Sequence, residues 1–459
     1  MKPLTVVILA AGRGTRMRSA TPKLLHDLCG RPLIDWPVAA ALHCGAERVV
    51  VVVSAKERLL EAALPDGVLI AHQGAPHGTG GAVLAAAEQL ERAGTVIVLA
   101  GDVPLIGEDL LRELAREHER SGAAATMVTM VLSDPSGYGR VVRDGAGEVE
   151  RVVETKNAGE ASSAELELHE VNTGVFAFQT GALLDVLGSV EPVGEEVYLP
   201  AVLPLLRAGG GRVGTLAATD HALLLGVNDR AQLAAVRAEA QRRIHDRHML
   251  AGVTITEPQT TTIDFAVQIA PDTLIEPCTQ LRGTTRIGAG AIIGPHSTII
   301  DSLLGDGVRV LHSHLVGAEL RAGATVGPFS YLRPDALLRD GAKAGAFVEV
   351  KNSDVGAGTK IPHLSYVGDA DIGEHTNLGA GTITANYDGH HKHRTTIGDR
   401  VRGGVDTSYV APVSVGDDAW TAAGSVVTGD VPAGALAVAR ARQRNVERYA
   451  ERRSDGDGA

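Results

Sequence analysis

Residues Val355 to Gly389 read VGAGTKIPHLSYVGDADIGEHTNLGAGTITANYDG, and aliphatic residues recur in this stretch at close to six-residue steps. The steps fall at Val355, Ile361, Val367, Ile372, Leu378 and Ile383. A period of six fits neither a helix, with 3.6 residues per turn, nor a two-sided strand, with a period of 2. It is typical of the hexapeptide solenoid, in which each short extended rung points one aliphatic side chain into a shared interior.

The repeat extends to both sides of this stretch. It begins weakly after Gly252 and becomes clear at Ile287. Near Asn386 the pattern breaks, so residues 387–396 must loop out. Further interior positions are expected at Ile287, Ile293, Val310, Val316, Val326, Leu332, Leu338, Ala344, Ile397, Val415 and Val427.

Five residues that a scaffold alone does not need stand among the rungs: His363, Tyr366, Asn377, Asn386 and Tyr387. Taken singly, most histidines of a chain are surface or structural residues. An imidazole nevertheless has a pKa suited to a general base near neutral pH. Together the five residues indicate an active site built on the repeat.

Composition limits the remaining possibilities. At 459 residues the chain exceeds the usual size of one domain. Its net charge of −12 argues against nucleic acid as a main partner, because binding a phosphate backbone needs basic surfaces. The three cysteines, Cys29, Cys44 and Cys278, lack metal-ligand or disulfide-framework spacing. The apolar run near the N-terminus is too short for a secretory signal, and no run reaches membrane-spanning length. We therefore expect a cytoplasmic protein with no membrane partner.

Short aliphatic runs alternate with helical patterns in the first 132 residues. The expected strands are Thr5–Leu9, Arg48–Val53, Val68–Ile70, Thr95–Leu99 and Ala124–Val131. Continuous apolar runs indicate strands that are buried on both faces, and hence a mainly parallel, Rossmann-like α/β sheet. Polar chemistry then belongs at the carboxyl ends of these strands.

The first expected strand runs into LAAGRGTRM, and Lys23 follows shortly after. Gly12 and Gly14 permit a tight turn whose N–H groups face an anion, while Arg16 and Lys23 add positive charge. Neither of the two common phosphate-loop motifs is present. Two glycines after a strand often form an ordinary turn, but the added charges favour phosphate binding.

Two further strands end in polar residues. Gln73 precedes a glycine-rich turn that starts at Gly78, where a flat base could lie and the Gln73 amide could read its edges. Alternatively, Thr79 simply caps the next helix. Asp102 follows the strand Thr95–Leu99 and suits a carboxylate that holds Mg²⁺ on substrate phosphates. Alternatively, it only begins an Asp-x-Pro turn.

The chain carries the motifs LAAGRGTRM…PK, GTGG, GDVPL, GYGR, VNTG and GVN, followed by hexads carrying RPDALL, PHLSYVGDADIG and GAGTITANYDG. These motifs closely resemble those of one family of bacterial two-headed enzymes. They are the bifunctional N-acetylglucosamine-1-phosphate uridyltransferases/glucosamine-1-phosphate N-acetyltransferases. The N-terminal motifs alone indicate only the wider class of sugar-nucleotide pyrophosphorylases, whereas the motifs on the hexads are far more specific. The resemblance implies acetylation of glucosamine 1-phosphate from acetyl-CoA. Transfer of UMP from UTP would then give UDP-N-acetylglucosamine and pyrophosphate for cell-wall precursors.

The same resemblance implies a domain order. A pyrophosphorylase domain with a mixed sheet would occupy residues 1–229, and a linker helix residues 230–250. A left-handed parallel β-helix would occupy residues 251–449, and a charged, disordered tail residues 450–459. The chain would form a homotrimer with acetyl-CoA bound between neighbouring chains.

In the C-terminal half, the resemblance makes His363 the general base for the sugar amine. Glu349 is the candidate to orient His363, because a base needs a second group to fix its tautomer. Arg333 and Lys351 would hold the sugar phosphate, and Tyr366 and Asn377 the sugar. The expected acetyl-CoA contacts are Ala380, Asn386, Tyr387, Val405, Ala423 and Arg440.

In the N-terminal half, the resemblance makes Asp102 and Asn228 the ligands of Mg²⁺. Arg16 and Lys23 would neutralise the triphosphate of UTP during catalysis. The expected nucleotide-sugar contacts are Leu9, Ala10, Ala11, Gly12, Lys23, Gln73, Gly78, Thr79, Gly139, Glu154, Asn172 and Asn228.

The chain departs from the family pattern at several positions. Val405 stands where the family often has a serine, which removes one polar contact beside acetyl-CoA. Val197, Pro200 and Ala201 replace three usual residues, which puts the role of their loop in doubt. Ala346 replaces a usual asparagine. None of these is a residue assigned to bond making.

Three rival hypotheses remain open. The β-helix could be only an oligomerising or regulatory module on a nucleotidyltransferase. The whole chain could instead be a non-catalytic nucleotide-sugar binding and assembly protein. The histidines at positions 390, 391 and 393 also suggest a metal site, although no cysteine accompanies them.

Overall fold

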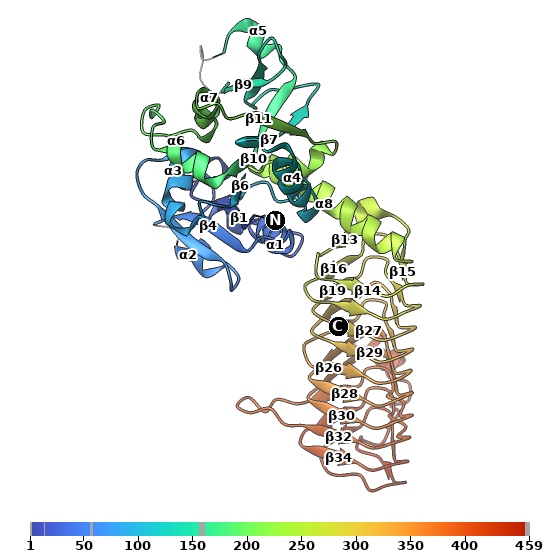
Figure 1. Cartoon of the computed structure of the whole chain (residues 1–459). Coiled ribbons are helices and arrows are strands. Elements are labelled where there is room, and N and C mark those ends of the chain that lie inside the picture. The colour runs from blue at the N-terminus through green and yellow to red at the C-terminus, as the bar shows by residue number, and fades with distance from the viewer. Residues whose placement is uncertain (1, 13, 56–57, 156–160, 455–459) are drawn as a thin grey trace. The chain divides into compact units, whose positions relative to one another are not determined.

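The computed structural model describes residues 2–12, 14–55, 58–155 and 161–454. Arg13 of the first glycine turn and residues 455–459 of the expected disordered tail lie outside the described residues. The chain divides into two compact units, Met1–Gln241 and Arg242–Ala459 (Figure 1).

The first unit is built on a mixed sheet. Its strands are β1 (Leu4–Leu9), β4 (Arg48–Ser54), β5 (Leu69–Gln73), β6 (Thr95–Ala100), β7 (Ala125–Val131), β8 (Arg140–Arg143), β9 (Val149–Val153), β10 (Glu170–Gln179) and β11 (Val213–Ala217). The sheet order is β11-β7-β10-β6-β1-β4-β5, and β8 joins β9 to β10. β1, β4, β5 and β6 pair in parallel, whereas β10 runs antiparallel between β6 and β7. All five strands expected from the apolar runs are present.

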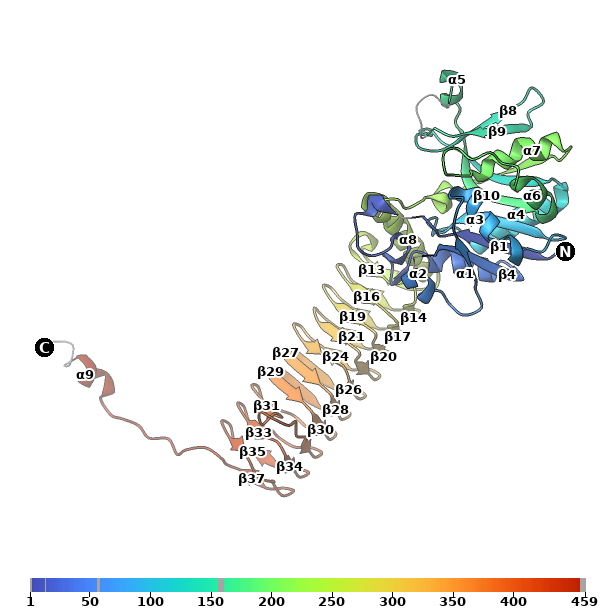
Figure 2. The ribbon, with the colours of Figure 1, turned by 90° about the vertical axis from the view of Figure 1, so that its left-hand side faces the viewer.

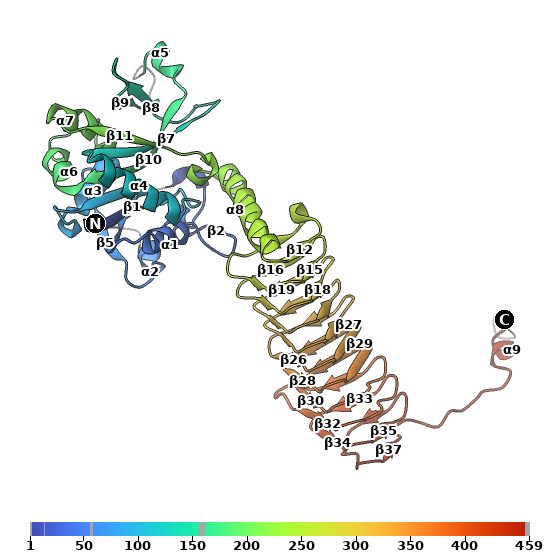
Figure 3. The same cartoon turned by 45° about the vertical axis from the view of Figure 1, so that its right-hand side comes forward.

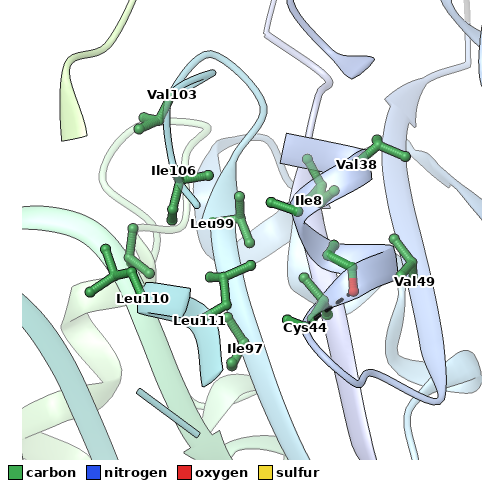
Figure 4. Packing of buried hydrophobic residues seen from close by; sticks show 14 of the residues in the cluster. Ile8, Val38, Cys44, Val49, Ile97, Leu99, Val103, Ile106, Leu110 and Leu111 are labelled. Atoms are coloured by element: carbon green, nitrogen blue, oxygen red, sulfur yellow. Dashed lines mark hydrogen bonds between the residues drawn. The ribbon is translucent and has the colours of Figure 1, made fainter. Parts of the chain in front are cut away.

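Helices cover both faces of this sheet. They are α1 (Asp35–His43), α2 (Arg58–Ala62), α3 (Gly78–Ala85), α4 (Glu108–Ser121), α5 (Ser163–Leu166), α6 (Thr180–Leu187) and α7 (Val202–Ala208), with a small separate hairpin of β2 (Asp27–Leu28) and β3 (Arg31–Pro32). Ile97 and Leu99 of β6 enter one core, where Leu111 of α4 packs beside them (Figure 4). Val96 and Val98 of the same strand enter the other core. Burial on both faces explains the continuous apolar runs and makes the strand ends a rigid platform.

A buried histidine lies between α4 and β7. His118 is 2% exposed, and its Nδ1 is 2.9 Å from the hydroxyl oxygen of Thr126. Burial lowers the pKa of His118 from 6.5 to about 4, and the nearby charge of Lys2 adds to this effect. The unfolded chain therefore binds a proton here at a higher pH than the folded chain does. Burial of neutral His118 therefore contributes stability that is complete above pH 6.5 and is lost as the pH falls toward 4.

We expect this histidine to remove about 2 kcal/mol from the unfolding free energy of the first unit between about pH 7.5 and about pH 5. Urea unfolding followed through Trp36, the only tryptophan of the first unit, measures the change. The variant His118→Gln should show a smaller loss between the two pH values. An equal loss in wild type and variant would contradict the assignment.

The second unit is a left-handed β-helix, in which three files of short parallel strands make three faces. The first file holds β12 (Thr254–Ile255), β15 (Leu274–Ile275), β18 (Ile292–Ile293), β21 (Arg309–Val310), β24 (Thr325–Val326), β35 (Trp420–Thr421) and β37 (Leu436–Ala437). The second holds β13 (Thr262–Ile263), β16 (Gln280–Arg282), β19 (Thr298–Ile300), β22 (His314–Val316), β25 (Tyr331–Leu332), β31 (Ile383–Ala385), β33 (Ser408–Val410) and β36 (Val426–Val427). The third holds β14 (Gln268–Ile269), β17 (Arg286–Ile287), β20 (Leu303–Leu304), β23 (Glu319–Leu320), β26 (Ala336–Leu338), β28 (Ser353–Val355), β30 (Ala370–Ile372), β32 (Thr395–Ile397) and β34 (Val413–Val415).

Two longer strands, β27 (Lys343–Lys351) and β29 (Lys360–Gly368), turn a corner and so belong to both the first and the second file. The strands within each file pair in parallel with successive coils in register. Figure 2 shows β13, β16 and β19 side by side, and Figure 3 shows β15 and β18. Each turn of the coil therefore uses about three hexads, in agreement with the sequence period.

The interior of the coil confirms most of the expected positions. Val355, Ile361, Val367 and Leu378 are fully buried, and Ile372 is 4% exposed. The remaining expected interior positions agree except for two.

The expectation was wrong at Ile383, which is 38% exposed, while Thr384 takes the interior place. The Thr384 hydroxyl donates to the Gly368 carbonyl at 2.9 Å and accepts from the Gly368 N–H at 2.8 Å, so the buried oxygen is satisfied. It was also wrong at Val316, which is half-buried beside the fully buried Leu315.

Three other segments bear on the expectations. The helix expected at the middle of the chain is present as α8 (Arg230–Leu250). A short helix, α9 (Tyr449–Ser454), lies in the stretch expected to be disordered. Residues 386–394 form a hairpin that leaves the coils near β30, as the sequence break predicts (Figure 1). The Asp388 carboxylate holds this hairpin by accepting from the backbone N–H groups of His390 and His391.

Candidate active sites

The turn after β1 brings a lysine against a glycine. Gly14 has a φ of +58°, and a Cβ on it would lie 2.5 Å from the Cβ of Lys23. Only glycine gives both the left-handed backbone and the space that this approach requires. The turn therefore serves to place the Lys23 ammonium at the end of β1.

Four polar groups meet at the ends of β1 and β6. Lys23 forms an ion pair with Asp102, and the two side chains are 11% and 23% exposed. The Asp102 carbonyl accepts from the N–H of Val227 at 2.8 Å, which fixes the following residue, Asn228. Arg16 donates to the side-chain oxygen of Asn228 at 2.8 Å. The structure thus brings together all four residues that were expected to handle phosphate and Mg²⁺.

The glycine-rich turn before α3 does not use Thr79 as a helix cap. The cap position is His77, and the Thr79 hydroxyl accepts from the N–H of Leu199 at 2.9 Å. Gln73 donates its amide N–H to the carbonyls of Gly78, at 2.9 Å, and Pro76, at 3.2 Å. Gln73 therefore holds the shape of this turn as well as lining the cavity beside it.

The loop with altered residues braces this turn. Val197 is 3% exposed, its N–H donates to the His77 carbonyl at 2.9 Å, and its carbonyl accepts from Gly80 at 2.7 Å. A Cβ on Gly80 would lie 2.6 Å from the Val197 side chain. The backbone of residue 197 makes these bonds whatever its side chain. This explains how the departure at Val197 leaves the turn intact.

A cavity of about 820 Å³ opens beside these groups, and a smaller one of about 220 Å³ adjoins it. Both cavities are lined by Leu9, Thr79 and Ala100, so they share one wall. Of the expected nucleotide-sugar contacts, the larger cavity is lined by Leu9, Ala10, Ala11, Gly12, Lys23, Gln73, Gly78 and Thr79, together with Asp102, and the smaller adds Gly139, Glu154 and Asn172. Arg16 and Asn228 line neither cavity and lie beside Asp102.

Sequence reasoning missed several residues of these cavities. Glu195 and Glu196 line the larger one, and Tyr138 and Tyr198 line the smaller. Arg140, 4% exposed, donates to the Tyr138 carbonyl and so holds this rim in place. Tyr138 could have been found from the GYGR motif, which contains it, whereas no local pattern singles out the two glutamates.

In the second unit, His363 begins a column of four residues on one corner of the coil. It is exposed on β29, and Ala380, Val405 and Ala423 follow it in consecutive coils. Val405 is 52% exposed. Three backbone bonds set this register: Gly381 N–H to His363 carbonyl at 3.3 Å, Asp406 N–H to Ala380 carbonyl at 2.7 Å, and Gly424 N–H to Val405 carbonyl at 2.8 Å. Three expected acetyl-CoA contacts thus form one line that starts at the expected base.

Positive charges gather on the face next to this corner. Arg333 bonds to Glu349 at 3.1 Å, and this bond raises the pKa of Arg333. Lys392 lies near Lys351, and this proximity, with the nearby charge of Arg333 contributing less, lowers the pKa of Lys392. Cations held this close favour an anion between them. Lys392 was missed as a site residue because it lies in the looped-out hairpin.

Glu349 lies apart from the residue it was expected to orient. In the ladder between β27 and β29, Glu349 stands opposite Tyr366, and Ala346 stands opposite His363. Within one chain, Glu349 therefore orients Arg333. The position beside His363 is one at which the chain departs from the family pattern.

The other expected residues lie at several places on the second unit. The Tyr366 hydroxyl is 3.4 Å from the amide nitrogen of Asn386, and a Cβ on Gly368 would lie 2.3 Å from that hydroxyl. Asn377 stands opposite Lys360, three residues before His363 on β29. Tyr387 is 61% exposed in the hairpin, and Arg440 is exposed beyond the last coil.

Two features of the described residues bear on the alternatives. No group of three or more His, Cys, Asp or Glu side chains there could hold a metal ion, and His393 of the hairpin pairs instead with Asp388 at 2.8 Å. No helix among these residues is long and apolar enough to span a membrane.

Comparisons with known proteins show the family of the chain. Residues 6–250 match the family model of the MobA-like NTP transferase domain. A protein of Kineococcus radiotolerans, named bifunctional protein GlmU, is 52% identical over 97% of this chain and 91% of its own length. Proteins of the same name from Streptomyces avermitilis and Mycobacterium tuberculosis are 48% and 45% identical, over 100% and 99% of this chain and 96% and 93% of their own lengths. Identity of this size over both halves shows that the chain belongs to the family of bifunctional GlmU proteins.

Proposed function

We propose that this bifunctional enzyme carries two separate active sites, one in each unit. The C-terminal site acetylates glucosamine 1-phosphate from acetyl-CoA. The N-terminal site then transfers UMP from UTP to N-acetylglucosamine 1-phosphate, giving UDP-N-acetylglucosamine and pyrophosphate for peptidoglycan and cell-envelope precursors. The cytoplasm is the proposed location, where thiols such as Cys44 and Cys278 stay reduced.

The N-terminal site works by positioning phosphates and neutralising their charge. A phosphate oxygen of N-acetylglucosamine 1-phosphate attacks the α-phosphorus of UTP. A new P–O bond forms, and the bond to the β-phosphate breaks as pyrophosphate leaves. Lys23 and Arg16 bring positive charge to the triphosphate. The two cavities with their shared wall seat the nucleotide and the sugar side by side.

Asp102 and Asn228 fit a magnesium site. Both offer hard oxygen atoms, and Mg²⁺ needs only one or two such protein ligands because substrate phosphates and water supply the rest. Each oxygen is bonded to a cationic side chain, Lys23 or Arg16. Phosphates that enter the cavity compete for these cations and free both oxygens. Bound Mg²⁺ supplies further neutralisation of the phosphate charge.

At the C-terminal site, His363 takes a proton from the sugar amine while the nitrogen attacks the thioester carbonyl. A C–N bond forms, the C–S bond breaks, and coenzyme A leaves as the thiol after it gains a proton. Arg333, Lys351 and Lys392 hold the phosphate of the sugar. The single observation that carries this assignment is the column from His363 through Val405 to Ala423, next to that cationic face.

The test uses the purified full-length chain. Acetyl-CoA with glucosamine 1-phosphate should release free thiol, and UTP with N-acetylglucosamine 1-phosphate and Mg²⁺ should release pyrophosphate. Pyrophosphate without thiol would favour a β-helix that only assembles the protein. If neither thiol nor pyrophosphate were released, that result would favour a nucleotide-sugar binding protein.

The proposed assembly is a homotrimer. Phe329 and Phe347 are 50% and 56% exposed, and their rings stack with centroids 5.1 Å apart. His312 extends the row, with its ring 4.4 Å from Phe329. Leu364, beside His363, is 63% exposed. An exposed pair of stacked apolar rings marks an interaction surface, and we expect a second copy of the chain seated there to form a cleft beside His363.

We expect Phe347→Ser to shift the protein from trimer to monomer and to lower acetyl transfer by about tenfold or more, because one buried aromatic at an interface can carry a few kcal/mol. Uridylyl transfer should not change. Light scattering after gel filtration gives the mass. Leu303→Ser, at a 49% exposed position in the third file, is the matched control. A wild-type monomer, or a trimeric Phe347→Ser variant, would contradict the proposal.

A further inference from the structure

A buried carboxylate that no role so far uses lies beside the cationic face. Asp369 is 6% exposed and has a φ of +50° at a corner of the coil. A buried carboxylate is costly unless several donors satisfy it. Its partners therefore show what it holds in place.

Three side chains from the two coils on either side of Asp369 donate to its carboxylate. Asn352 donates to Oδ1 at 2.6 Å, and the Lys351 ammonium lies 3.3 Å from Oδ1 and 3.1 Å from Oδ2. Asn386 donates to Oδ2 from the next coil. Burial alone would raise the pKa of Asp369, but these three hydrogen bonds hold it below its ordinary value. The carboxylate therefore stays charged beside Lys351.

Asp369 also holds both ends of the hairpin 386–394. Its carboxylate binds Asn386 at the start, and its carbonyl accepts from the N–H of Thr395, just past the end, at 3.1 Å. The hairpin carries Lys392 to the cationic face. One residue thus contacts Lys351 directly and fixes the base of the segment that bears Lys392.

The same carboxylate reaches the acetyl-CoA side. The Asn386 amide that donates to Asp369 also lies 3.4 Å from the Tyr366 hydroxyl. Its orientation is therefore set by Asp369 on one side and Tyr366 on the other. A fixed amide at this position presents its remaining polar atom in one direction only.

We propose that Asp369 is a positioning residue of the acetyltransferase site, which couples the residues for the sugar phosphate to those for acetyl-CoA through Lys351 and Asn386. This inference rests on the proposed function of that site. Asp369 touches neither substrate in this arrangement. It orients an ammonium group toward one substrate and an amide toward the other, so its loss weakens the binding of both substrates together.

The test compares Asp369→Asn with the wild type. Asparagine keeps the size and tolerates the left-handed backbone, but it replaces one accepting oxygen by a donor that faces Lys351 or Asn386. We expect the KM for glucosamine 1-phosphate and the KM for acetyl-CoA each to rise about tenfold. This factor corresponds to the loss of one charge-assisted hydrogen bond. The kcat should change by less than about threefold. Uridylyl transfer and the melting temperature should stay near the wild-type values.

Asp301→Asn is the matched control. Asp301 also lies in the left-handed region, with a φ of +47°, and accepts from the N–H of Thr284 at 2.9 Å, with no contact to the cationic face. It should leave both KM values unchanged. A structural role common to corner aspartates would affect the two variants alike.

A double-mutant cycle adds a readout that a merely structural role would not move. Lys351→Met should raise the KM for the sugar phosphate strongly in the wild type and much less in Asp369→Asn, because the two residues act as a pair. Additive effects, unchanged KM values, or a fall in melting temperature alone would overturn the inference. A wild type without acetyl transfer would instead overturn the proposed function, and the inference would fall with it.

Discussion

We expect His363→Ala to lower acetyl transfer about a thousandfold and to leave uridylyl transfer unchanged. A positioned general base contributes about 10²- to 10⁴-fold to such a step, and His363 stands at the start of the column proposed to bind acetyl-CoA. The amine of the sugar would then have to lose its proton to water. Thiol release and pyrophosphate release, measured on one preparation, give both activities.

His375→Ala is the matched control for this variant, because His375 is also exposed on the coil but belongs to no part of the site. It should keep both activities. Retention of more than about a tenth of the acetyl transfer in His363→Ala would exclude His363 as the base, since the expected loss is far larger. Loss of both activities would show that the two sites depend on each other.

For Asp102→Ala we expect the opposite pattern of activities. We expect uridylyl transfer to fall about a thousandfold, because the change removes both a proposed ligand of Mg²⁺ and the partner of Lys23. Acetyl transfer should not change. The milder Asp102→Asn keeps one oxygen and should need a higher Mg²⁺ concentration for half-maximal pyrophosphate release.

Asp109→Ala serves as the control here, since its carboxylate pairs with Arg112 on the surface of α4. It should behave as the wild type at every Mg²⁺ concentration. An Asp102→Ala variant with an unaltered response to Mg²⁺ would contradict the assignment of the metal site, even if its activity were low.

The coil shows why a hexad pattern predicts a fold better than it predicts each interior residue. Val355, Ile361 and Val367 were found by their aliphatic character, and all are buried. Thr384 was missed because a hydroxyl is interior only when the backbone can satisfy it, as Gly368 does here. Ile383, the aliphatic residue one place earlier, was therefore predicted to be the interior residue.

In the first unit, apolar runs located β1, β4, β5, β6 and β7. Strands that are buried on both faces consist of continuous apolar residues, which are easily found in a sequence. They could not show that β10 runs antiparallel between β6 and β7. Strand direction depends on which connection brings the chain back to the sheet, and that connection has no local pattern. The sequence therefore predicted the layer but not its order.

The sites divide in the same way. Lys23 and Asp102 could be found because each follows a strand at the edge where ligands bind. Lys392 and Asp369 could not, because their roles depend on contacts between consecutive coils that no spacing within one coil reveals. The pairing of Glu349 with Arg333 within one chain could not be predicted for the same reason, since it depends on the ladder register that places Ala346 beside His363.

The central claim is that one chain holds two chemically independent sites, and a mixing experiment tests it most directly. His363→Ala and Asp102→Ala are each incubated with glucosamine 1-phosphate, acetyl-CoA, UTP and Mg²⁺, singly and together. Each variant alone should release almost no pyrophosphate, and the mixture should restore it, because the acetylated sugar made by one variant is used by the other. A mixture as inactive as the separate variants would contradict the account.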